Sequence, residues 1–166
     1  MNSEQNTIKE QATHLFEAAQ KASRTLTRLT EAEVNSLLKT LADALERETP
    51  AILEANESDL ARMDVNDPKY DRLRLTSERL KGIADDLRNV ARLSSPLDKI
   101  LSETIRPNGM RLRKITVPFG VIGVIYEARP NVTVDVFSLC FKTRNVCVLK
   151  GSVDAEASNL ALAKVI

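Results

Sequence analysis

Along the first hundred residues, apolar side chains recur every three or four positions, which is the period of an amphipathic helix. One such stripe runs through residues 8–19, a second through residues 34–45 and a third through residues 80–91. Charged residues fill the opposite faces and are dispersed, as on a solvated helix surface. The pattern predicts a layer of helices over residues 1–100.

Capping residues place the starts of two of these helices. Thr30 and Glu33 have the spacing of a capping box ahead of the second stripe. Thr49 followed by Pro50 predicts a cap and a first helical residue, because proline lacks the N–H that this position leaves unpaired.

The period changes to two in residues 101–118. Asn108-Gly109 separates two segments in which apolar and polar residues alternate. Asn-Gly favours positive φ at both central positions of a two-residue turn, so this stretch predicts a β-hairpin. A lone two-stranded hairpin is marginally stable, so we expect it to pack on or pair with something else.

Residues 119–166 predict a parallel βαβα unit. Val121–Ile125 is an almost continuous apolar run, typical of a strand covered on both faces, and residues 145–149 form a second one. Helical patterns follow each strand, so the crossover is expected to be right-handed. Gly120 and Gly123 are interpreted as positions of close packing.

Two parallel strands alone leave an apolar edge unpaired. We therefore expect these residues to be the front part of a longer protein, with the fold class α/β and the sheet incomplete.

Composition narrows the class of protein. The 166 residues carry a net charge of +1, with 43% apolar and 28% charged residues, which gives no basic surplus for nucleic acid. No apolar run is long enough to predict a membrane span, and the first residues do not have the pattern that predicts a secretory signal. Cys140 and Cys147 lie in apolar surroundings and are expected to be free thiols of a cytoplasmic protein, with a disulfide or redox pair as the alternative. His14 has no partner for a metal site, and none is predicted.

Candidate chemistry lies in the two loops that follow the strands, because parallel sheets bind ligands beyond the carboxyl ends of their strands. Lys150 can place an ammonium near a phosphate or ribose hydroxyl, and Gly151 and Ser152 allow a close approach at a helix start, although a merely solvated lysine is the commoner case. Asn131 is expected either to cap the next helix or to donate to an oxyanion. Arg129 suits a carboxylate or phosphate, or a surface ion pair.

The stretch "GVIGVIYEARPNVTVD" and the later "VLKG" and "SN" resemble the γ-glutamyl phosphate reductase family, a branch of the aldehyde dehydrogenase superfamily. "ANESDL" at residues 55–60 and "DRLRLTSERL" at residues 71–80 are similar to that family too. The resemblance covers nearly the whole chain but only the N-terminal part of a typical member, and it implies the start of a Rossmann-like NADP-binding domain at residues 119–166.

The resemblance implies a reductase of proline biosynthesis that converts L-glutamyl 5-phosphate to L-glutamate 5-semialdehyde and phosphate with NADPH. A cysteine thiolate displaces phosphate to form a thioester, which hydride transfer then reduces. By this resemblance Lys150, with Gly151 and Ser152, belongs to the cofactor site, and Asn131 is the oxyanion donor. The complete protein is expected to be a homo-oligomer with residues 101–118 as its arm.

Two departures from the family qualify that reading. The nucleophilic cysteine is not in this chain, since Cys140 and Cys147 lie in a helix and a buried strand, so the 166 residues alone are expected to be inactive. Arg144 stands where the family often has glycine before asparagine, which affects the local turn. The alternative function is a stand-alone helical interaction module without catalysis.

Overall fold

The computed structural model describes residues 2–166, without the side chains of residues 2–6 and 8. Seven α-helices, one 3₁₀ helix and four strands make up this part of the chain. In chain order they are α1 (Asn2–Leu26), α2 (Glu31–Arg47), α3 (Thr49–Leu60), α4 (Tyr70–Leu73), α5 (Ser77–Arg92), β1 (Ile100–Ile105), β2 (Arg111–Ile115), β3 (Val121–Ile125), α6 (Asn131–Lys142), β4 (Val146–Lys150), η1 (Val153–Ala155) and α7 (Glu156–Val165).

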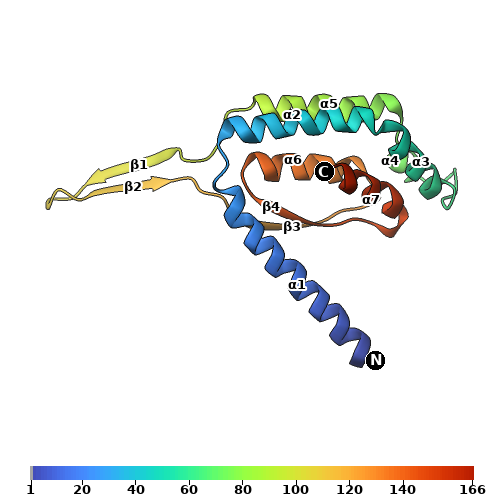
Figure 1. Cartoon of the computed structure of the whole chain (residues 1–166), viewed down its shortest axis with the longest axis horizontal. Helices are drawn as coiled ribbons and strands as arrows, with labels where there is room; N and C mark the ends of the chain where they lie inside the picture. The colour runs from blue at the N-terminus through green and yellow to red at the C-terminus, as the bar shows by residue number, and fades with distance from the viewer. Residues whose placement is uncertain (1) are drawn as a thin grey trace.

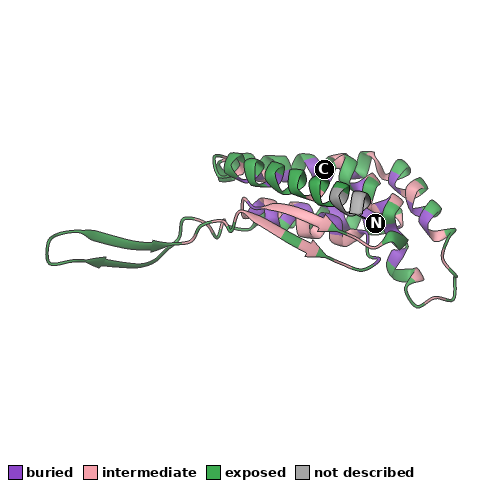
Figure 2. Cartoon of the chain, turned by 90° about the horizontal axis from the view of Figure 1, so that it is seen from below, coloured by how far each residue is buried: buried purple, intermediate pink, exposed green. Residues whose placement is uncertain are grey.

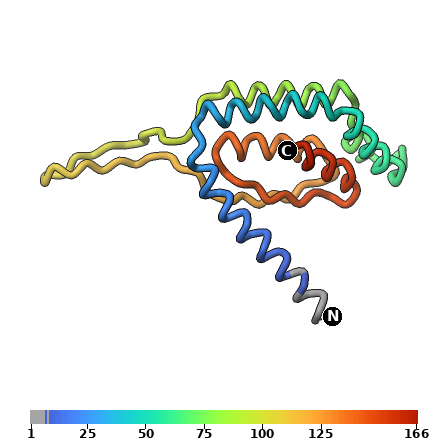
Figure 3. The backbone as a smooth tube through the Cα atoms, viewed as in Figure 1, coloured from blue at the N-terminus to red at the C-terminus, as the bar shows by residue number. Residues whose placement is uncertain are grey.

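The body of the molecule has three layers (Figure 1). Helices α2 and α5 lie side by side as the outer layer, α6 and α7 form the middle layer, and the parallel strands β3 and β4 form the third. Helix α1 runs away from the body toward the N-terminus, whereas the C-terminus lies beside α6 and α7 (Figure 3). The β1–β2 hairpin extends from the other side.

The predicted stripes and one predicted cap account for the outer layer. Thr30 and Glu33 make the reciprocal capping box, with Thr30 N donating to Glu33 Oε2 at 2.7 Å and Glu33 N donating to Thr30 Oγ1 at 3.2 Å. Most apolar positions of α2 and α5 are buried, which confirms the two stripes. The prediction that Thr49 caps α3 is wrong: Glu48 holds that position, and Thr49 Oγ1 donates back to Leu45 O at 3.1 Å.

One hydrophobic core joins the outer and middle layers. Val134 of α6 and Leu162 of α7 belong to the same buried cluster as the apolar faces of α2 and α5. Burying a side chain of this size stabilises the fold by about 1.5–3 kcal/mol. The first hundred residues and the βαβα unit therefore depend on each other for a core.

Helix α1 contributes less to that core than its sequence predicts. Ala19 is buried, but Leu15 is 52% and Phe16 is 55% exposed. Ile8, the first residue of the predicted stripe, lies outside the described side chains. The helix contacts β3 and β4.

The predicted hairpin is present, but its turn differs from the predicted one. Gly109 N donates to Arg106 O at 2.8 Å and Arg106 N donates to Met110 O at 2.9 Å, so Pro107 and Asn108 are the central turn residues. Of these turn residues, only Gly109 has positive φ, at 81°. Proline fixes φ near −65°, which favours a type I turn followed by a glycine bulge over the predicted two-residue turn. Every residue of both strands is exposed (Figure 2).

Strands β3 and β4 pair in parallel, from Val121 opposite Val146 to Ile125 opposite Lys150. Within this chain no residue of either strand is fully buried and Ile125 is 86% exposed, so burial on both faces stays a prediction for the longer protein. Among the described helices, α6 packs on β4 and α1 contacts both strands.

Gly120 and Gly123 are not close-packing positions, because an added Cβ would meet nothing within 4 Å at either residue. Gly120 is needed for its φ of 108°, which other residues rarely adopt. Its N–H donates to Asn145 Oδ1 at 2.8 Å, so the two strand starts are tied together.

Arg144 follows α6 in a left-handed conformation, with φ at 53°. Its N–H donates to Phe141 O at 2.9 Å, and the Asn145 N–H donates to Cys140 O at 2.8 Å. These two bonds are those of a Schellman motif, in which glycine usually holds the position of Arg144. The guanidinium lies 3.8 Å from Asp98 Oδ2.

Candidate active site

The loops after β3 and β4 lie next to each other, as the parallel pairing requires. Tyr126 N donates to Lys150 O at 3.1 Å, which continues the register one step beyond the strands. The first loop leads into α6 and the second into η1 and α7. All five predicted site residues are therefore at one edge of the sheet.

Lys150 is exposed, and the one contact of its ammonium in the described structure is to the neighbouring Gly151 O at 2.9 Å. It forms no ion pair with any described carboxylate, so the charge is available to a ligand. An ammonium group that is not paired with a carboxylate can bind the phosphate or hydroxyl oxygens of a dinucleotide at this edge.

Gly151 is required by the protein itself. A Cβ there would overlap Asn159 Nδ2 and lie 3.1 Å from the Tyr126 hydroxyl oxygen, so packing alone accounts for the glycine, and its predicted part in a ligand site stays a prediction. Tyr126 and Thr133 hydroxyls are 2.7 Å apart, and Thr133 Oγ1 donates to Asn159 Oδ1 at 3.0 Å. This chain of contacts holds the two loops and α7 together.

Ser152 caps η1 with its hydroxyl. Ser152 Oγ accepts from Asp154 N at 3.2 Å and donates to Asp154 Oδ2 at 3.1 Å. The hydroxyl is thus occupied within its own turn, and Lys150 is the group of this loop that is most open to a ligand.

Asn131 does not cap α6, because it is the first helical residue and Pro130 holds the cap position. Asn131 Nδ2 instead donates to Asp135 Oδ2 at 3.1 Å, one turn further along. That bond orients the amide and leaves its second N–H for another acceptor, as an oxyanion donor requires. Burial raises the pKa of Asp135, and the bond from Asn131 and the charge of Asp86 act in opposite directions on it.

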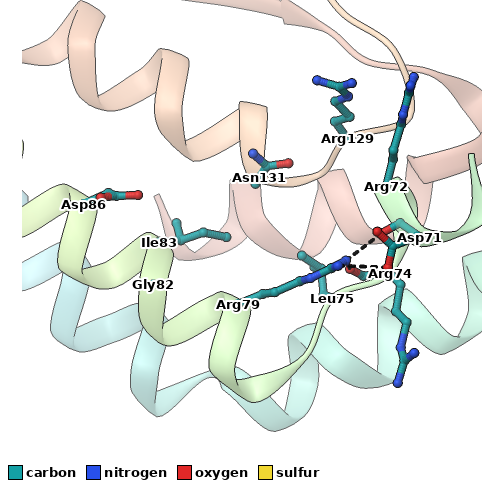
Figure 4. A pocket seen from close by; sticks show the side chains of 10 residues that line it. All are labelled: Asp71, Arg72, Arg74, Leu75, Arg79, Gly82, Ile83, Asp86, Arg129 and Asn131. Carbon is teal, nitrogen blue, oxygen red and sulfur yellow. Dashed lines mark hydrogen bonds and ion pairs between the residues drawn. The ribbon is translucent and has the colours of Figure 1, made fainter.

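A cavity of about 380 Å³ opens beside Asn131, between α5 and the loop after β3 (Figure 4). Its lining is unusually rich in arginine and consists of Asp71, Arg72, Arg74, Leu75, Arg79, Gly82, Ile83, Asp86, Arg129 and Asn131. Arg129 and Asn131 thus share one cavity, whereas Lys150 does not line it.

The arginines of this cavity differ in how far they are engaged. Arg79 donates to Asp71 Oδ1 at 2.9 Å and to two main-chain carbonyls at 2.6 Å, so it is a fixed part of the wall. Arg72 lies 3.7 Å from Glu127 Oε2. The Arg129 side chain has no hydrogen bond or ion pair to the described residues, which rules out the predicted surface pair within this part of the chain.

A buried polar cluster between α3 and α7 is not predicted by any pattern in the sequence. Asp59 Oδ2 accepts from Ser158 N at 2.7 Å and from Ser158 Oγ at 2.6 Å, and Asp59 Oδ1 accepts from Ala157 N at 3.1 Å. Asn56 Nδ2 donates to the same hydroxyl at 3.0 Å. The family-like "ANESDL" and "SN" segments therefore meet at the start of α7, and "DRLRLTSERL" forms the cavity wall.

Both cysteines are free thiols, as predicted. Burial raises the pKa of the Cys140 thiol. Burial and the neighbouring Cys140 raise the pKa of the Cys147 thiol to about 11. No group of three or more His, Cys, Asp or Glu residues suited to a metal occurs within the described residues. None of the helices described there has the length and apolar character that a bilayer crossing needs.

No protein-family model matches the chain. By structure it is similar to γ-glutamyl phosphate reductase from Thermotoga maritima, with a TM-score of 0.87 and 33% identity over 90% of this chain and 37% of that one. A probable aldehyde dehydrogenase from Listeria monocytogenes has a TM-score of 0.68 at 12% identity, over 94% of this chain and 32% of that one. The fold is thus part of the aldehyde dehydrogenase fold.

The curated relatives narrow this class. Gamma-glutamyl phosphate reductase of Bacteroides thetaiotaomicron is 62% identical over 151 residues, which are 91% of this chain, and that of Bacteroides fragilis is 60% identical over 151 residues. The chain belongs to the γ-glutamyl phosphate reductase family and spans 36% of the length of each of these relatives.

Proposed function

We propose that this chain is the N-terminal part of an NADPH-dependent cytoplasmic reductase of proline biosynthesis. Its substrate is L-glutamyl 5-phosphate, and its products are L-glutamate 5-semialdehyde and phosphate. The observation that carries the proposal is the oriented Asn131 amide, which lines a cavity that it shares with the unpaired Arg129 side chain, at the same edge of the sheet as Lys150.

Asn131 donates its free amide N–H to the acyl oxygen of the substrate as negative charge develops there. Asp135 holds the amide in place, which avoids the cost of orienting it during the reaction. Lys150 contacts the cofactor, and the nicotinamide supplies the reducing hydride when it is bound.

Neither cysteine of this chain serves as the nucleophile. A thiolate is the reactive species, and burial raises the pKa of both thiols well above neutral pH. We therefore expect the purified 166-residue polypeptide to show no NADPH-dependent reduction of an acyl phosphate. Turnover by this polypeptide would contradict the assignment of the nucleophile.

The role of Lys150 is tested by Lys150→Ala in the complete reductase, with NADPH fluorescence reporting binding. Removing one charge-assisted contact is expected to weaken NADPH binding roughly tenfold. Lys39→Ala, an exposed lysine on α2, is the control for the loss of a positive charge. Equal NADPH affinities for wild type and Lys150→Ala would place the lysine among the merely solvated residues.

We also propose that the β1–β2 hairpin joins copies of the protein into a homo-oligomer. Both of its faces are exposed, and they carry large apolar side chains, including Ile105, Met110 and Leu112. Ile105→Glu is expected to lower the mass measured by light scattering, whereas Lys114→Ala on the same hairpin is not. An unchanged mass in Ile105→Glu would exclude the hairpin as the contact between copies. It would also count against the alternative function, the stand-alone interaction module, because the hairpin is the surface best suited to that role.

A further inference from the structure

We propose that the cavity beside Asn131 binds the substrate lengthwise, with its ammonium group at Asp86 and its phosphate group at Arg129 and Arg72. This inference rests on the proposed function, because it takes the substrate to be an amino acid acyl phosphate. It adds the positions that select such a substrate, which are Asp86 and Arg72 together with Arg129.

The two ends of the cavity carry opposite charges. In Figure 4, Asp86 lies at one end, Arg129 and Arg72 at the other, and Asn131 between them. On the α5 side of the cavity, Asp86 lies seven residues beyond Arg79, which is about 10 Å along a helix axis. Six bonds separate the ammonium nitrogen of the extended substrate from its phosphorus, or about 7–8 Å. The α5 wall of the cavity is therefore long enough for the extended substrate, and Asn131 lies between the two charged ends in Figure 4, where the acyl carbon would be.

The acidic end lacks a cation. Asp86 has no hydrogen bond or ion pair to any side chain that the structure describes, although its neighbour Asp85 pairs with Arg88 at 3.1 Å. The charges of Asp86 and Asp135 repel each other, and this repulsion helps to raise the pKa of Asp135. A bound ammonium would relieve the repulsion, so this end favours a substrate with an amino group.

At the basic end, one guanidinium group has no partner among the described residues and the other has one distant partner. Arg129 makes no side-chain bond to the described residues, and Arg72 reaches Glu127 only at 3.7 Å. A planar guanidinium matches a phosphate with two parallel hydrogen bonds. Arg79 cannot serve in this way, because its donors are bound to Asp71 and to main-chain oxygens, and in Figure 4 the Arg74 side chain points in the opposite direction from those of Arg129 and Arg72.

The volume is consistent with a small ligand. A cavity of about 380 Å³ falls within the range of about 300–1,000 Å³ for small-molecule sites. A substrate that lacks either charged group would leave one end of the cavity unpaired, which lowers its affinity.

The test runs the complete reductase in reverse, from L-glutamate 5-semialdehyde, phosphate and the oxidised cofactor, because the two charged groups are then on separate substrates. Arg129→Ala is expected to raise the KM for phosphate roughly tenfold or more and to leave the KM for the semialdehyde little changed. Asp86→Asn is expected to do the opposite. Arg92→Ala and Asp85→Asn remove the same charges from exposed positions of α5 outside the cavity and are expected to change neither constant.

Arg129→Lys keeps the charge but not the planar fork, so its KM for phosphate is expected to lie between those of wild type and Arg129→Ala. Wild-type constants in both Arg129→Ala and Asp86→Asn would overturn the inference while leaving the proposed function in place. The inference would also be overturned if either variant raised the KM for phosphate and the KM for the semialdehyde equally.

A binding measurement separates the two hypotheses if the reductase shows no turnover. Inorganic phosphate is titrated into the 166-residue chain, and its ³¹P NMR line width is followed. Broadening that is lost in Arg129→Ala would support the anion end of the cavity even though the proposed function had failed. Equal ³¹P line widths in the unchanged chain and in Arg129→Ala would refute phosphate binding at Arg129.

Discussion

Arg144 holds a backbone conformation that favours glycine, and replacing it tests whether that conformation costs stability. Its φ of 53° completes the Schellman motif at the end of α6. A left-handed conformation costs a residue with a Cβ roughly 1–2 kcal/mol, and glycine gives back about 0.5–1 kcal/mol through its freer unfolded chain. The net gain expected for glycine over alanine at this position is about 1 kcal/mol.

The comparison that isolates this gain is Arg144→Gly with Arg144→Ala. Both changes remove the same contacts, including the 3.8 Å pair with Asp98, so only the Cβ differs between them. Urea denaturation followed by circular dichroism measures the free energy of unfolding. For a chain of this length, a difference of about 1 kcal/mol corresponds to about 2–4 °C in Tm.

Equal stabilities of the glycine and alanine variants would refute the reasoning, because the left-handed conformation would then carry no cost. A glycine variant that is less stable than the alanine variant would refute it more strongly. Asn145→Ala provides the contrasting case: Asn145 completes the same motif but also bonds Gly120 N, so its loss is expected to be destabilising.

Three other outcomes are expected. Asp59→Ala should lower the free energy of unfolding by about 1–3 kcal/mol, because it leaves buried donors at the start of α7 unpaired. Ser58→Ala on the exposed side of α3 should have little effect, and similar losses in both variants would contradict a stabilising role of the Asp59 cluster. Asp135 has a raised pKa, so the folded state favours its neutral form, and the free energy of unfolding falls as pH rises from the ordinary pKa of 3.8 through the raised one. Asp135→Asn should therefore flatten the acid part of the stability–pH profile, and an unchanged profile would count against this. Cys140 and Cys147 should react slowly with a thiol reagent at pH 8 in the folded chain and rapidly in denaturant, and fast labelling of the folded chain would exclude raised thiol pKa values.

The local pattern of residues determined the secondary structure of this chain. The helical stripes, the Thr30–Glu33 box, the hairpin and the strand–helix–strand order appear where the sequence predicts them, because each depends on neighbours within a few residues. The motifs around Asn131 and Lys150 identified the edge of the sheet where chemistry is expected. Errors at this level were also local, as at Pro107, which changed the turn type, and at Thr49, which does not cap its helix.

Tertiary structure decided what the side chains at that edge contact. Asp59 bonds Ser158, ninety-nine residues away, and Gly151 is needed because Asn159 approaches it from α7. The cavity joins residues of α4 and α5 to Arg129 and Asn131, which no spacing in the sequence brings together. Periodicity and caps report the forces between near neighbours, whereas a cavity and a buried polar cluster exist only after distant helices have packed on a shared core.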